Sequence, residues 1–203
     1  MRILFFLLLG FVALPSNAQQ FAFEFWHTGK VVIDSGDTLR GNLKYDMSND
    51  ILQVQIDKRL ESFSSRKVLF FEIFDESVKQ YRTFYSLPFS QGAQYKTPVF
   101  FELLEEGKLT VLTRESLEYR TTSSPFYYYG TISRPVLVNK YFVLKENGDI
   151  EEFRGKKNDW LELMRTKADD VERFARSNRL GFDEKYQLGR IIAYYNSLFV
   201  KKN

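Results

Sequence analysis

The sequence predicts an α+β fold: a mostly antiparallel β-sheet or partly closed barrel with two or three C-terminal helices packed on it. Three observations lead to this prediction. Apolar and polar residues alternate with a period of two from about residue 21 to residue 154, turn residues interrupt the alternation, and the period becomes helical after Gly155. A period of two gives a strand one buried and one solvated face, as in antiparallel sheets.

Half-buried strands are expected in the N-terminal part of this region. Every second side chain is apolar along residues 21–26, 38–45 and 52–56. In the second of these segments the buried face would consist of Leu39, Leu43 and Tyr45.

Two further segments are apolar on both sides. Residues 68–74 are interrupted only by Glu72, and residues 99–104 only by Glu102. We expect them to be central strands covered on both faces. A buried carboxylate is costly unless it is paired, so each glutamate is expected to point outward or to meet an arginine.

Turn residues predict how the strands are joined. Asn147-Gly148 is the strongest hairpin signal, because a type I′ turn needs positive φ at both central positions. Residues 34–37 and Glu106-Gly107 join two other pairs of strands. Hairpins in succession favour an antiparallel meander.

Residues 121–135 interrupt the strand pattern. Serine, threonine and proline residues typical of a loop come first, a run of aromatic residues follows, and Arg134-Pro135 closes the segment. We expect a long, partly irregular excursion from the sheet.

Helical periodicity begins after Gly155. Asn158 or Asp159 is expected to cap a first helix and Asp183 a last one, since their oxygens accept hydrogen bonds from free backbone N–H groups. Such helices are not stable alone in water, so they must pack on the sheet or on one another. The buried stripe of the last helix would consist of Leu188, Ile191, Ile192, Tyr195, Leu198 and Phe199.

The first 18 residues have the pattern of a secretory signal peptide. Arg2 supplies the positive charge, an apolar run follows, and Ser16 and Ala18 are the small residues of a cleavage site after Ala18. The run is shorter than the roughly 20 apolar residues of a membrane-spanning helix. We therefore expect an exported protein, located in the periplasm or outside the cell.

The rest of the chain is expected to form one globular unit. Residues 19–155 would be its antiparallel β region and residues 156–203 its C-terminal helical region. No later stretch is apolar for long enough to cross a bilayer, so no transmembrane segment is expected in the mature chain. There is no cysteine, which excludes a lipoprotein anchor and disulfide bonds.

Charge and motifs narrow the classes of function. The net charge is +3 with both signs interspersed, whereas a nucleic-acid-binding protein carries a basic patch, so no nucleic acid is expected. The one histidine, His27, excludes a multi-histidine metal site, and no nucleotide-binding or hydrolase motif occurs. Ser64 and Lys67 have S-x-x-K spacing but lack the supporting motifs of penicillin-binding enzymes. We expect no catalytic residues, no cofactor and no metal.

Aromatic side chains are the candidate contact residues. Aromatic residues make up 17% of the chain. Neighbouring exposed rings mark interaction sites, since tyrosine and tryptophan anchor interfaces at low entropic cost. The alternative is that the rings alternate and half of them fill the core. The candidates are Phe126, Tyr127, Tyr128, Tyr129 and Trp26.

The chain also resembles an uncharacterised exported protein family of Bacteroidota. The resemblance lies in residues 29–32, in residues 36–41 running into Tyr45-Asp46, in residues 99–104 with Gly107, and in Tyr194-Tyr195-Asn196. It implies a location in the envelope or outside a Gram-negative cell. It implies no activity and no functional residues.

Three hypotheses on function follow. The first is an exported non-catalytic binding or interaction module of the cell envelope, whose partner is an envelope protein or a glycan. The second is a small-ligand or glycan-binding β-barrel. The third is a carboxylate-dependent hydrolase, for which Glu102 is the best residue. The sequence does not indicate the oligomeric state.

Overall fold

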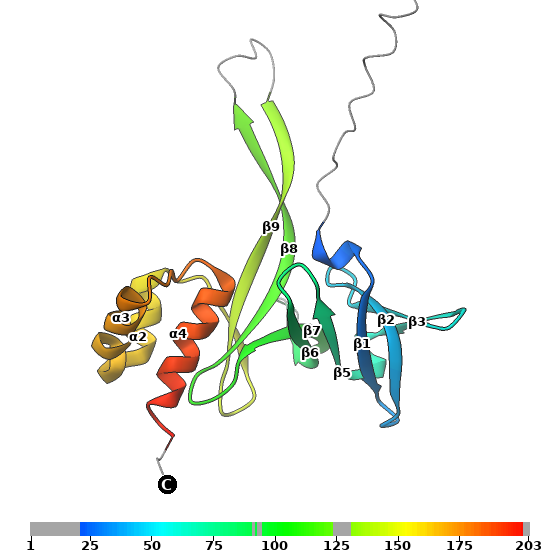
Figure 1. Ribbon diagram of the computed structural model, residues 1–203, viewed down its shortest axis with the longest axis horizontal. Helices are drawn as coiled ribbons and strands as arrows, with labels where there is room; N and C mark the ends of the chain where they lie inside the picture. The colour runs from blue at the N-terminus through cyan, green and yellow to red at the C-terminus, as the bar shows by residue number, and fades with distance from the viewer. Residues whose placement is uncertain (1–20, 91, 93–94, 124–130, 201–203) are drawn as a thin grey trace, which may run out of the picture.

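The computed structural model describes residues 21–90, 92, 95–123 and 131–200 (Figure 1). The predicted signal peptide and the predicted contact residues Phe126, Tyr127, Tyr128 and Tyr129 lie outside the described residues.

All described strands belong to one antiparallel sheet, which confirms the predicted fold class. Its order is β10-β9-β8-β7-β6-β5-β1-β2-β3-β4, and no ladder joins the edge strands β10 and β4, so the sheet is not closed into a barrel. The strands are β1 (His27–Ile33), β2 (Thr38–Asp46), β3 (Ile51–Ile56), β4 (Arg59–Ser64), β5 (Val68–Asp75), β6 (Gln80–Phe89), β7 (Thr97–Glu105), β8 (Thr110–Ser123), β9 (Thr131–Leu144) and β10 (Ile150–Phe153).

The strand order is a meander with one departure. Strands β1 to β4 follow one another, as do β5 to β10, but β5 pairs with β1 rather than with β4. The short 3-10 helix η3 (Ser65–Lys67) lies between β4 and β5 in the chain. The predicted hairpin at Asn147-Gly148 is present between β9 and β10, but only Gly148 has positive φ, so the turn is not of type I′.

The buried face of the N-terminal half agrees with the period-two pattern. Leu43 and Tyr45 of β2 are buried, and Leu39 is half-buried beside them. Apolar side chains of β1, β3 and β5 join them in one core. Stacked and tilted rings fill the centre, with Phe71 and Phe84 at a centroid distance of 4.5 Å.

One expectation for this half is wrong, and another is met only in part. The segment predicted as a first strand forms the 3-10 helix η2 (Ala22–Glu24), because the Glu24 carboxylate accepts a hydrogen bond from the Phe21 backbone N–H. Strand β5 is central, but its second face is covered only in part: Phe70, Glu72 and Phe74 are half-buried, and Leu69, beside the bulge of β1, is 50% exposed. Glu72 lies on this half-buried face and pairs with Lys30.

Three helices cover the C-terminal half on one face (Figure 1). They are α2 (Lys157–Met164), α3 (Ala168–Ser177) and α4 (Lys185–Ser197), and η4 (Arg165–Lys167) links the first two. Trp160 and Ile191 share a buried cluster with Val111 of β8. Neither Asn158 nor Asp159 is the N-cap of α2, which is Lys156; Asp159 lies in the first turn and its carboxylate accepts from the Lys156 backbone N–H. Asp183 makes no cap for α4, whose N-cap is Glu184.

Strands β8 and β9 extend far beyond the rest of the sheet. Their ladder runs from Thr110↔Leu144 to Ser123↔Thr131, whereas β7 pairs with β8 only up to Thr113. The remaining half of this hairpin projects from the body as a two-stranded ribbon (Figure 1). We call residues 116–123 and 131–138 the arm. Regular strand thus replaces much of the irregular excursion predicted for residues 121–135.

Candidate functional site

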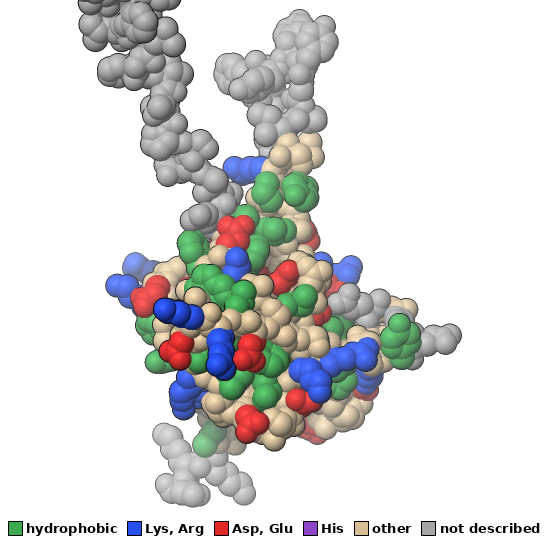
Figure 2. Space-filling model, turned by 90° about the vertical axis from the view of Figure 1, so that its right-hand side faces the viewer, with side chains coloured by type: hydrophobic (Ala, Val, Ile, Leu, Met, Phe, Trp, Pro, Cys, Tyr) green, Lys and Arg blue, Asp and Glu red, His purple; other side chains and the backbone are tan. Residues whose placement is uncertain are grey.

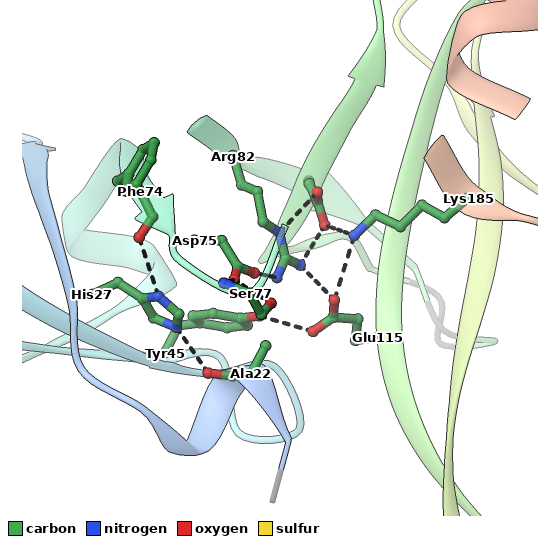
Figure 3. A network of polar contacts seen from close by, with 10 residues as sticks. Ala22, His27, Tyr45, Phe74, Asp75, Ser77, Arg82, Glu115 and Lys185 are labelled. Carbon is green, nitrogen blue, oxygen red and sulfur yellow. Dashed lines mark hydrogen bonds and ion pairs between the residues drawn. The ribbon is translucent and has the colours of Figure 1, made fainter. Parts of the chain in front are cut away.

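The body of the protein contains a buried cluster of charged side chains, centred on Arg82 of β6 (Figure 3). The Arg82 guanidinium donates to Asp75 at 2.9 Å, and its Nε and Nη2 donate to Glu102 at 3.0 and 2.7 Å. It also donates to Glu115 at 2.5 Å. The two bonds to Glu102 form the fork geometry that suits a guanidinium and a carboxylate.

The first turn of α4 and the end of β2 complete the cluster. Lys185 Nζ donates to Glu102 at 2.6 Å and lies 3.4 Å from Glu115. The Tyr45 hydroxyl donates to Glu115 at 2.8 Å. The cluster therefore ties the N-terminal strands, the centre of the sheet and the last helix together.

The pKa values of two carboxyl groups of the cluster, Glu115 and Asp75, favour their charged forms. Burial by itself raises the pKa of Glu115, but the charges of Arg82 and Lys185 and the hydrogen bond from Tyr45 outweigh it, so this pKa lies below its ordinary value. Burial likewise raises the pKa of Asp75, and hydrogen bonds from Ser77 and Arg82 lower it further than burial raises it. Both carboxyl groups are therefore ionised at neutral pH and are poor general acids.

Glu102 is the best residue of the hydrolase hypothesis. It pairs with Arg82, which is one of the two arrangements expected for this glutamate from the sequence. Its two oxygens accept from Arg82 and Lys185, and 3% of the residue is exposed. These contacts indicate a structural role for the cluster. Breaking a buried ion pair leaves an uncompensated charge, so the loss of one partner destabilises the fold.

A second ion pair lies where β8 separates from β7. Arg114 donates to the Asp50 carboxylate at 2.9 Å and to the backbone carbonyls of Phe100 and Met47. Asp50 also accepts from the Phe100 N–H at 2.8 Å. The side chains of Asp50 and Arg114 thus bind the backbone N–H and C=O of Phe100, as a neighbouring strand would.

A cleft of about 640 Å³ opens between α2, α3 and the chain before α4. Trp160 and Phe182 line it together with Tyr141, whose hydroxyl is buried and has no hydrogen-bond partner among the described residues. Burial raises the pKa of Tyr141 to about 12, so this hydroxyl remains a neutral donor. The cleft could accept an apolar group bearing a hydrogen-bond acceptor.

The arm exposes apolar side chains. In its ladder Leu117 lies opposite Leu137 and Tyr119 opposite Pro135, so these residues share one face. Leu117 is 38% exposed and Tyr119 is 74% exposed. Beyond Thr113, no described strand continues β8 on the side of β7.

The candidates predicted from the sequence are not brought together among the described residues. Trp26 is 42% exposed at the start of β1, and no described ring stacks on it. The predicted contact residues 126–129 belong to the undescribed connection between β8 and β9. His27 is buried, and its ring nitrogens lie 2.8 Å from the Ala22 carbonyl oxygen and 3.3 Å from that of Phe74, so it fastens η2 to β5.

Sequence reasoning missed most of the charged cluster. Arg82, Glu115 and Lys185 stand among polar neighbours in the sequence and carry no signal of burial. Only Glu102 does, because it interrupts an apolar run.

The described residues show no charged patch on the face drawn in Figure 2, no metal-binding group and no membrane-spanning helix. On the face shown in Figure 2, basic and acidic side chains are interspersed. Within the described ranges, no group of three or more histidine or acidic side chains could hold a metal ion. No helix in this part of the chain is long and apolar enough to span a bilayer.

The chain matches no protein-family model, and no curated protein or solved structure is detectably similar to it. The resemblance to an exported family of Bacteroidota therefore stays a prediction.

Proposed function

We propose that the protein is an exported, non-catalytic interaction module of the cell envelope, and that the arm is the element that contacts a partner protein. The observation that carries this proposal is the exposure of Leu117 and Tyr119 on a ribbon that projects from the body. A two-stranded hairpin is marginally stable in water without further packing. A partner that covers its apolar face would supply this packing.

The two other hypotheses have less support. An open sheet lacks the enclosed interior that a small-ligand barrel uses. The carboxylates of the buried cluster are each held by a cation, whereas a glycosidase needs an acid with a raised pKa. Export rests on the N-terminal sequence pattern alone.

Photocrosslinking in living cells tests the proposal. A photoreactive residue at Ser133, which is exposed on the apolar face of the arm, should give an adduct with another envelope protein. The matched control is Tyr81, which is 68% exposed on β6 of the body and should give none.

The identified partner is then purified and its affinity measured. We expect Leu117→Ser to weaken binding at least about tenfold, because an exposed apolar anchor is lost, and Tyr81→Ser to leave it unchanged. Equal adducts at both positions, or none at Ser133, would contradict the proposal. An adduct with a polysaccharide would instead favour a glycan partner.

A further inference from the structure

Pro135 shows which backbone groups of the arm are free. In an antiparallel ladder each residue turns its N–H and C=O to the same side, and successive residues alternate. Proline has no N–H and is tolerated where that position faces away from the neighbouring strand. Pro135 lies opposite Tyr119, so both turn their backbone groups outward. By the same alternation Leu117 and Thr121 also face outward from β8.

The edge of β7 that faces this side is closed by side chains. Asp50 and Arg114 bind the N–H and C=O of Phe100, and the Ser65 hydroxyl donates to the Pro98 carbonyl at 2.7 Å. The corresponding edge of β8 has no such partner among the described residues. Within residues 21–90, 92, 95–123 and 131–200, nothing covers the edge of β8 along the arm, whereas proline interrupts the edge of β9.

The charged side chains of the arm also lack ion-pair partners among the described residues. Glu118, Arg120 and Arg134 lie on the face opposite Tyr119, and Arg120 stands directly across from Arg134. Like charges directly opposite each other destabilise a ladder. None of the three residues forms an ion pair with another described residue.

We propose that β8 pairs antiparallel with β8 of a second copy of this chain, around a two-fold axis at Tyr119. In this register Glu118 lies opposite Arg120 of the second copy, and the symmetry makes this contact twice. Leu117 lies opposite Thr121 of the second copy, and the outward backbone groups of both strands form about six hydrogen bonds.

The pairing would remedy each deficiency of the arm. Arg120 gains a carboxylate on the side away from Arg134. The two arms become a four-stranded sheet in which Leu117, Tyr119, Pro135 and Leu137 of both copies form one apolar face. This inference rests on the proposed function, because it assigns one edge of the arm to a second copy and leaves the apolar face to the other partner.

Strand β4, one of the two edge strands of the described sheet, is a competing edge. Arg59, Leu60 and Glu61 are exposed there, and pairing of two β4 strands centred on Leu60 would also join opposite charges. Glu61→Arg is therefore the matched control for substitutions in β8.

Analytical ultracentrifugation of the purified full chain tests the inference. We expect a dimer, and we expect Glu118→Arg and Arg120→Glu each to weaken it at least about tenfold, because both symmetric contacts then join like charges. An equimolar mixture of the two variants should dimerise again, since every contact in the mixed dimer joins opposite charges. Glu61→Arg should leave the dimer intact, and far-ultraviolet circular dichroism checks that each variant is folded.

A wild-type monomer at all concentrations would overturn the inference, as would a dimer that Glu118→Arg leaves intact or Glu61→Arg breaks. Failure of the mixture to dimerise would also overturn it. If the wild type is monomeric while the Ser133 adduct persists in cells, only the inference fails. If the dimer forms while Ser133 gives no adduct, only the proposed function fails.

Discussion

The two halves of strand β8 lie in opposite environments. From Val111 to Arg114 the side chains are buried, and the guanidinium of Arg114 is bound by Asp50 and two backbone carbonyls. From Leu117 to Thr121 the side chains are exposed, and the charged ones have no ion-pair partner in the described chain. One strand thus passes from a buried region in which its charged side chain is paired to an exposed region in which the charged side chains have no partner among the described residues.

This difference separates stability from interaction. In the body, carboxylates and cations compensate one another out of water, so losing one partner is costly. In the arm, unpaired edges and apolar side chains face solvent at little cost to the fold but remain available to a partner. Substitutions in the two halves should therefore have separable effects.

The largest effect is expected at Arg82. Arg82→Met should lower the free energy of unfolding by about 3–5 kcal/mol, because it leaves three carboxylates facing one buried ammonium group. Arg134→Met, which removes an exposed arginine of the arm, should change it by less than about 0.5 kcal/mol. Urea denaturation measures the free energy of unfolding of both variants. Equal changes would contradict the distinction between body and arm.

The next comparison uses one residue type in one strand. Leu112→Ala in the body should cost about 2–5 kcal/mol, because Leu112 is 1% exposed and its removal leaves a cavity. Leu117→Ala in the arm should cost less than about 0.5 kcal/mol in dilute protein. If Leu117→Ala destabilised the chain as strongly as Leu112→Ala, the arm would be part of the core.

The smallest effect concerns pH. Because the pKa values of Glu115 and Asp75 are lowered in the folded state, their contribution is fully present above the ordinary unfolded pKa of about 4 and is lost as pH falls through the lowered values. Stability in urea should therefore decline below about pH 4, and Glu115→Gln should make the decline shallower. A constant stability between pH 5 and pH 3 would show that these groups contribute nothing.

Features that depend on contacts between residues close in the sequence could be predicted from it, whereas features that depend on contacts between distant residues could not. Alternation placed Leu43 and Tyr45 in the core, and Asn147-Gly148 placed a hairpin, because both signals are local. Glu102 was identified as unusual, since a charge in an apolar run needs a partner. Its partner Lys185 is 83 residues away along the chain and could not be named.

The sequence by itself determined the class of fold, the antiparallel pairing of neighbouring strands and the C-terminal helices, because periodicity and turn chemistry act over a few residues. Only the tertiary structure decided that β1 pairs with β5, that five charged side chains meet in the interior, and that β8 separates from β7 after Thr113. These features depend on strand register and on the packing of distant segments, where the free energy of a charge is set by neighbours far away in the chain.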